Sequence, residues 1–253
     1  MKAVDDILQA LSPISLEDMS GIRLMNRTDT KYVMDRARLA ALLEMAADDY
    51  SVQESEGQRQ APYRTVYLDT PAMQMFQAHE CGRRVREKIR VRTYEATETT
   101  FLEVKNKNNR GRTDKKRILV SSIGHMAEEG ATDFLRRHAW YDLDDLVPRL
   151  ETRFRRITLV NHKRTERLTI DCELAFHNIN NDHELALPGL VIVELKRDGL
   201  TPSPAKEMLR KLHVHPAGFS KYCMGCALTD PGLRQNRIKP RLHRVLALNG
   251  ASV

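Results

Sequence analysis

Basic and apolar side chains alternate along one segment after another of this sequence. At positions 88–94, which read Lys-Ile-Arg-Val-Arg-Thr-Tyr, the first, third and fifth residues are basic and the second and fourth are apolar. The alternation returns at 102–107, 115–120, 167–172 and 193–196. Because successive side chains of a strand point to opposite faces, each segment predicts a strand with one charged face and one mostly apolar face.

The charged faces constrain how these strands assemble. One such strand alone fits an ordinary antiparallel sheet with a wet side. Several strands whose charged faces are dominated by Lys and Arg repel one another unless an anion lies between them. A closed antiparallel sheet with a cationic interior and a polyanionic ligand removes this repulsion. We therefore predict an α+β fold, in which helices cover the apolar outer faces of the sheet.

The rest of the pattern places helices around the strands. Apolar residues at helical spacing predict helices at 5–20, 35–47, 203–212 and 220–228. Strands are expected at 27–34, 63–69, 85–94, 99–107, 113–120, 152–160, 166–172 and 190–197. We expect a single domain over residues 1–228 that contains a helical insertion at 123–146, followed by a basic, solvated tail at 229–253.

Composition indicates an anionic partner. The 253 residues carry a formal net charge of +7, which suits nucleic acid, a membrane surface or phosphate. Nucleic-acid binding is not expected, because aromatic residues make up only 6% and are not interleaved with the bases. The first residues contain no apolar signal region, and no segment reaches the roughly 18 apolar residues of a membrane span. We therefore expect a cytoplasmic protein without a transmembrane segment.

Two cysteines form a CxxC motif, Cys223 and Cys226, within the helix expected at 220–228. His213 and His215 precede them, so zinc binding or dithiol chemistry has to be considered. There is no second CxxC, and packing of the thiols beside a helix is the favoured interpretation.

Five short motifs, in order along the chain, resemble one known family. They are Thr30-Lys31-Tyr32, Tyr67-Leu68-Asp69-Thr70, the strand at 88–94, the strand at 101–107 and Phe219-Ser220-Lys221-Tyr222. Together they resemble the VTC domain, the catalytic domain of the vacuolar transporter chaperone polyphosphate polymerase and its bacterial relatives. That family belongs to the triphosphate tunnel metalloenzymes, within the CYTH-like superfamily. The resemblance implies a closed eight-stranded antiparallel barrel. It also implies transfer of the γ-phosphate of ATP or another nucleoside triphosphate to a growing polyphosphate chain, with Mn²⁺ or Mg²⁺.

The resemblance assigns roles position by position. The catalytic, phosphate-binding bases would be Lys31, Arg90, Arg92, Lys105, Lys115, Arg156 and Arg167. Ser220 and Lys221 would contact phosphate near the C-terminal end. The sequence departs from the family at Gly218, where a basic residue is frequent.

Carboxylates on the charged faces are few. By resemblance Glu194 would bind the metal, and Glu103 points along the same kind of face, either as a metal ligand or to balance charge. Lys107 and Arg117 face inward by alternation, and Lys196 follows Glu194 by two positions. These three bases are expected to assist in phosphate binding.

Three functions are consistent with these residues. The first is a metal-dependent ATP:polyphosphate phosphotransferase. The second is a tunnel triphosphatase, nucleoside triphosphatase or nucleotide cyclase. Those relatives usually begin with a Glu-x-Glu-x-Lys strand, whereas residues 27–31 contain one acid, Asp29. The third is a non-catalytic polyphosphate-binding module, which requires that Glu194 bind no metal. We expect no membrane domain in this chain, so it could not itself export a product. Whether it binds a membrane-protein partner is left open.

Overall fold

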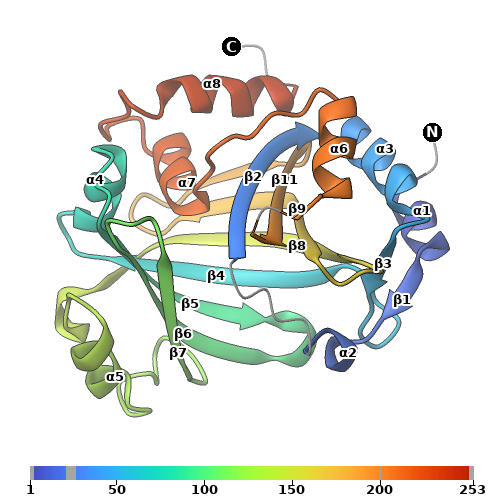
Figure 1. Cartoon of the computed structure of the whole chain (residues 1–253). Helices are drawn as coiled ribbons and strands as arrows, with labels where there is room; N and C mark the ends of the chain where they lie inside the picture. The colour runs from blue at the N-terminus through green and yellow to red at the C-terminus, as the bar shows by residue number, and fades with distance from the viewer. Residues whose placement is uncertain (1–2, 21–26, 200, 251–253) are drawn as a thin grey trace.

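An antiparallel sheet forms the centre of the molecule (Figure 1). The computed structural model describes residues 3–20, 27–199 and 201–250. The main strands lie side by side in the order β2 (Arg27–Asp35), β11 (Leu190–Asp198), β9 (Glu166–Asn178), β8 (Val147–Asn161), β4 (Ala61–Asp69), β5 (Arg86–Tyr94), β6 (Thr99–Lys107) and β7 (Thr113–Leu119). Shorter strands extend the sheet, with β10 (His183–Leu187) beside β9, β3 (Tyr50–Gln53) beside β8, and β1 (Ser12–Ile14) parallel to β3.

The sheet curls on itself but is open along one seam (Figure 1). β2 and β7 are the two ends of the strand order, and no strand pairing joins them within the described residues. The predicted closure of the barrel is therefore wrong at this seam. Lys115, Lys116 and Arg117 form the centre of β7, and a strand rich in Lys is typical of a sheet edge that resists further pairing. The predicted α+β class, an antiparallel sheet flanked by helices, is confirmed.

Helices cover the outer, apolar face of one half of the sheet. α3 (Arg36–Ala46) and α6 (Pro204–Lys211) begin after Asp35 and Ser203, whose side chains accept hydrogen bonds from backbone N–H groups of the first turn. Each such cap contributes about 1 kcal/mol to stability. Together with α1 (Val4–Ala10), these helices pack on outward-facing residues of β2, β8, β9 and β11.

The N-terminal segment differs from the single helix predicted at 5–20. α1 ends at Ala10, β1 follows, and α2 (Leu16–Ser20) comes after it. Pro13 lies within β1. Its fixed φ and missing N–H interrupt a helix, so the apolar spacing there misled the prediction.

α7 (Lys221–Thr229) packs against inner-face residues at one end of the sheet. The ring of Tyr222 stacks on that of Tyr67 from β4, with centroids 5.1 Å apart, and its hydroxyl donates to Asp69 at 2.5 Å. The Asp69 carboxylate also accepts backbone N–H groups from the first turn of α4 (Gln74–Glu80). One buried carboxylate therefore fixes β4, α4 and α7 relative to one another.

The expected insertion at 123–146 contains α5 (Ala131–His138) and a short 3-10 turn (Leu143–Asp145); another such turn, Glu95–Thr97, joins β5 to β6. Phe134 of α5 is buried, whereas Trp140, which follows the helix, is 53% exposed.

The C-terminal segment is more than a solvated tail. Residues 239–248 form α8 (Lys239–Leu248), and Leu242 and Val245 of this helix are buried in the same core as α7. Within the described parts of the chain, no helix combines the length and the apolar character needed to cross a membrane.

Gly225 of α7 allows the helix to approach β8 and β9 closely. A Cβ atom at this position would lie 2.5 Å from Cδ2 of Leu150 and 2.5 Å from Cδ1 of Phe176. In an exposed helix Gly→Ala stabilises by about 1 kcal/mol. Here we expect Gly225→Ala to lower the free energy of unfolding by about 1–3 kcal/mol, because the core becomes overpacked.

Gly124→Ala is the matched control for this prediction, because its new Cβ would meet only Ser122, at 3.8 Å. Urea denaturation measures both variants. A Gly225→Ala protein as stable as the control would contradict the packing described for α7.

Candidate anion-binding channel

The basic residues predicted from alternation lie on the inner face of the curled sheet. Residues directly opposite one another on paired strands share a face, and the register links Lys31 to Glu194 and Arg90 to Glu103. The bases on this face are Lys31, Arg86, Lys88, Arg90, Arg92, Lys105, Lys107, Lys115, Arg117, Arg156, Arg167 and Lys196. We call this inner face, with the first turn of α7, the channel.

Burial of these bases varies across the channel. Arg90 and Arg92, on the central strand β5, are buried. Lys115 and Arg117 lie on the edge strand β7 and are exposed. The structure therefore brings all the predicted bases to one face, with the deepest ones on β5.

Glu103 forms a buried cluster with Arg90 and Lys115. The Arg90 guanidinium donates from Nε and Nη2 to one carboxylate oxygen at 2.8 and 2.5 Å, and Lys115 Nζ donates to the other oxygen at 2.8 Å. Although burial raises it, the charges of Arg90 and Arg92 hold the pKa of Glu103 well below its usual range. The carboxylate therefore stays ionised and balances part of the positive charge.

Asp171 forms a second cluster at the α7 end. Nε and Nη2 of Arg156 donate to its two oxygens at 2.6 and 2.9 Å, and Lys221 donates to it as well. Burial alone would raise the pKa of Asp171, but Arg156 and Lys221 hold it well below its usual range. The sequence placed Asp171 on a charged face without giving it a role.

Aromatic rings that the sequence analysis did not single out surround two of the arginines. The rings of Tyr63 and Phe154 stack with centroids 5.2 Å apart. The Cζ atoms of Arg156 and Arg92 lie 4.9 and 5.6 Å from the Tyr63 centroid. Such cation–π contacts orient a guanidinium without neutralising it. The alternation in the strand predicted at 63–69 is the signal that could have placed Tyr63 in the channel.

Arg92 and Lys105 are held among like charges. Arg92 has no ion pair with a carboxylate among the described residues; its Nε donates to Thr65 Oγ1 at 3.1 Å. Burial, followed by the charges of Arg90 and Arg156, lowers the pKa of Arg92 to about 10. The charge of Arg90, then burial, lowers the pKa of Lys105 well below its ordinary value.

Glu194 is more accessible than the other two carboxylates that hydrogen-bond to bases on the inner face, Glu103 and Asp171. Its side chain is 24% exposed, against 0% for Glu103 and 6% for Asp171. It accepts a hydrogen bond from Lys196 and lies opposite Lys31. Although burial raises it, the charges of Lys196 and Lys31 hold the pKa of Glu194 well below its usual range.

A metal ion in the channel would take most of its coordinating oxygens from a bound phosphate compound and few from the protein. No group of three or more His, Cys, Asp or Glu side chains suited to a metal ion occurs within the described residues. Mg²⁺ often binds through one or two carboxylates together with substrate phosphates. Glu194 fits this arrangement, whereas both oxygens of Glu103 already accept hydrogen bonds from bases.

The CxxC cysteines do not resemble a reactive or metal-binding pair. Cys223 and Cys226 are free thiols, both buried in the core beneath α7. Burial raises the pKa of both thiols. Their surroundings thus favour packing over nucleophilic chemistry.

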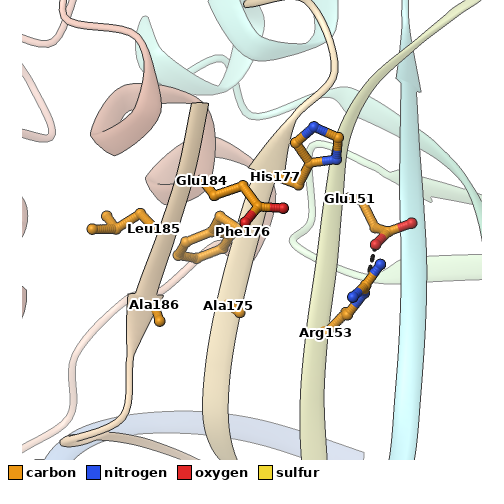
Figure 2. A pocket seen from close by; sticks show the side chains of 8 residues that line it. All are labelled: Glu151, Arg153, Ala175, Phe176, His177, Glu184, Leu185 and Ala186. Carbon is orange, nitrogen blue, oxygen red and sulfur yellow. Dashed lines mark hydrogen bonds and ion pairs between the residues drawn. The ribbon is translucent and has the colours of Figure 1, made fainter. Parts of the chain in front are cut away.

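A shallow pocket of about 190 Å³ lies away from the channel, across β8, β9 and β10 (Figure 2). Its charged residues include Glu151 and Arg153, which pair with each other at 2.7 Å. His177, also in the pocket, contacts Asp182 at 2.7 Å. Because these charges are already balanced, the pocket lacks the excess positive charge that distinguishes the channel.

Comparison with known proteins identifies the family. Over residues 26–229 the sequence matches the family described as the VTC domain. The chain belongs to the VTC domain family. The resemblance carried by the five motifs is thereby confirmed. Among curated proteins, no significant match is found.

Two solved structures are similar at low sequence identity. A candidate adenylyl cyclase from Hippeastrum, described as having a dominant triphosphatase activity, is 13% identical, with 81% of this chain and 97% of that one covered and a TM-score of 0.48. A candidate adenylate cyclase from Vibrio parahaemolyticus is 11% identical, with 78% and 96% covered and a TM-score of 0.46. Similarity at this level does not transfer an activity to this VTC domain.

Removing the charge of Glu103 should lower the stability of the protein substantially. Glu103→Gln should lower the free energy of unfolding by about 3–5 kcal/mol, because it leaves the buried Arg90 without its counter-charge. Glu151→Gln is the control, since its partner Arg153 is 67% exposed and such pairs contribute about 1 kcal/mol or less. Chemical denaturation of both variants measures the difference. Equal, small losses would show that Glu103 does not balance the charge of the inner face.

Proposed function

We propose that this protein is a metal-dependent polyphosphate polymerase that transfers the γ-phosphate of ATP to a linear polyphosphate chain held in the channel. Membership of the VTC domain family supports this proposal. The bases of the channel come from all of the main strands except β4. A lining of this kind suits an extended anion better than a single small one.

The excess positive charge around Arg92 carries the proposal. A buried cation without a partner costs several kcal/mol even after relaxation, and Arg92 is only 7% exposed. Phosphate oxygens would remove this cost, because a guanidinium binds them through two parallel hydrogen bonds and a lysine acts as a point charge. Arg92, Arg156 and Lys105 together offer both kinds of contact.

Phosphoryl transfer requires positioning and charge stabilisation more than covalent catalysis. In the proposed reaction, a terminal oxygen of the chain bonds to the γ-phosphorus of ATP. The bond from that phosphorus to the β–γ bridging oxygen breaks, and ADP leaves with the electron pair. Arg92, Arg156 and Lys105 would stabilise the charge on the transferred group. Glu194 would hold a divalent metal, and the chemistry that such an ion would supply is charge stabilisation on phosphate oxygens.

A triphosphatase would use the same channel but transfer the phosphoryl group to water. The inner face of β2 supplies one acid, Asp29, opposite Lys196. Two-metal hydrolysis needs several carboxylates around its ions, and the described residues contain no such cluster. The shortage of acids favours the polymerase over this alternative.

Purified protein incubated with ATP and Mn²⁺ should produce a ladder of polyphosphate on a gel, with a matching release of ADP. Phosphate release from triphosphate without chain growth would identify a hydrolase. Binding of polyphosphate without turnover would identify a binding module. Either of these outcomes contradicts the proposal.

The Glu194→Gln variant tests the role of the metal ligand separately from that of the phosphate-binding bases. We expect Mn²⁺-dependent turnover to fall by at least about 100-fold, because the amide cannot replace the charge that holds a hard cation. Binding of inorganic triphosphate in the presence of EDTA should persist or tighten, since a negative charge leaves the channel. Glu151→Gln, outside the channel, should retain full activity. Metal-dependent turnover that survives in Glu194→Gln would disprove the assignment.

A further inference from the structure

Two lysines from distant strands converge on a short segment at the α7 end of the channel. Lys31 Nζ on β2 donates to the carbonyl oxygen of Phe219 at 3.0 Å. Lys88 Nζ on β5 donates to Oγ of Ser220 at 2.8 Å. Ser220 is also the N-cap of α7, so the positive end of that helix lies beside both ammonium groups.

A third cation reaches the same segment from α8, which lies beyond the residues that match the family. A Cβ atom at Gly218 would lie 3.7 Å from Cζ of Arg241. Because Leu242 and Val245 are buried, α8 is fixed against the core and positions Arg241 over Gly218. We call residues 218–220, with Lys31, Lys88 and Arg241, the mouth of the channel.

No ion pair balances these cations within the described part of the chain. Burial, and after it the charges of Lys31 and Arg86, lowers the pKa of Lys88 to about 8. Glu80 of the neighbouring α4 instead accepts the backbone N–H of Arg237 at 3.0 Å. The mouth therefore differs from the Glu103 and Asp171 clusters, in which a carboxylate lies between two bases.

The positive charges near the mouth also act on His79 of α4. Burial, followed by the charges of Lys88, Arg86 and Arg241, lowers its pKa to about 2. The ring is therefore neutral near pH 7. Its Nδ1 atom is buried and has no hydrogen-bond partner among the described residues. A neutral ring does not add to the repulsion, but it contributes no negative charge to offset the surrounding cations.

We propose that α8, through Arg241, extends the channel at its α7 end, so that the mouth is an anion subsite for the part of a linear phosphate chain that continues past Arg92 and Lys105. The proposal rests on the proposed function in taking a phosphate chain as the ligand. An arginine fork, two lysine point charges and a helix N-terminus are each suited to phosphate oxygens. Arg241, Lys31 and Lys88 approach the consecutive residues Gly218, Phe219 and Ser220, and three cations along one short segment match a repeating anion better than an isolated one.

Binding of inorganic triphosphate and of long-chain polyphosphate to the full chain, measured by calorimetry at several salt concentrations, tests the subsite. Arg241→Ala should weaken long-chain binding by about tenfold, the loss of one charge-assisted hydrogen bond. It should reduce the slope of log affinity against log salt by about 1, as for one lost phosphate contact. Triphosphate is expected deeper in the channel, at Arg92 and Lys105, and makes no contact with Arg241. Its affinity for the Arg241→Ala variant should therefore lie within about twofold of its affinity for the unaltered protein.

Lys239→Ala is the matched control. It removes the same charge from the same helix, but two positions from Arg241 and therefore on the opposite side of α8. Equal losses of long-chain affinity in the two variants would indicate diffuse surface charge and overturn the subsite. An Arg241→Ala protein that binds long chains like the original would also overturn it. Failure of the unaltered protein to bind either ligand would instead refute the proposed function.

Gly218→Asp provides an independent test that leaves α8 unchanged. The new carboxylate would fit beside Arg241 without a close contact, since the Cβ atom would be 3.7 Å from Cζ. It should compete with phosphate and weaken long-chain binding at least as much as Arg241→Ala. Unimpaired binding would contradict the proposal. Equally tight binding of poly-glutamate to the unaltered protein would assign the mouth to an acidic protein segment and overturn the phosphate assignment.

Discussion

Repulsion among the bases of the inner face is the constraint on which the rest of the structure depends. Three carboxylates of the inner face, Glu103, Asp171 and Glu194, accept hydrogen bonds from bases and lower the cost of bringing strands together. They are too few to neutralise the face, and Arg92 and Lys105 are held among like charges. We propose that an anion completes a fold with this imbalance, so that the same residues are costly to bury without a ligand and form a binding site with one.

Apolar packing on the outside of the sheet, and at the α7 end of its inner face, holds the charged residues in place. One core lies under α1, α3 and α6, and another under α4, α5, α7 and α8. Asp69, through Tyr222 and the first turn of α4, fixes the helix that begins at the mouth. The bases are therefore positioned by contacts that do not depend on a ligand. Such preorganisation lowers the cost of binding and, in an enzyme, of stabilising the transferred group.

The sequence predicted the features that depend on local periodicity. A two-residue period fixes which side chains share a face, so Arg90, Glu103 and Lys105 could be placed together before their partners were known. Closure of the sheet was predicted from the repulsion between bases and from the family resemblance, but local periodicity does not determine it, because it depends on whether β2 and β7 meet. Asp171 lacked a role because its partner Lys221 is far along the chain. Arg241 was expected to be solvated, since only the packing of α8 brings it to Gly218.

A crystal structure with inorganic triphosphate tests the central claim most directly. If the inner face needs an anion to balance its charge, phosphate oxygens will lie within hydrogen-bonding distance of Arg92, Arg156 and Lys105. Their side chains should move little, because the apolar packing already positions the strands that carry them. Triphosphate bound only on the outside of the sheet, for example beside Arg153, with no anion between β5 and β9, would contradict the account.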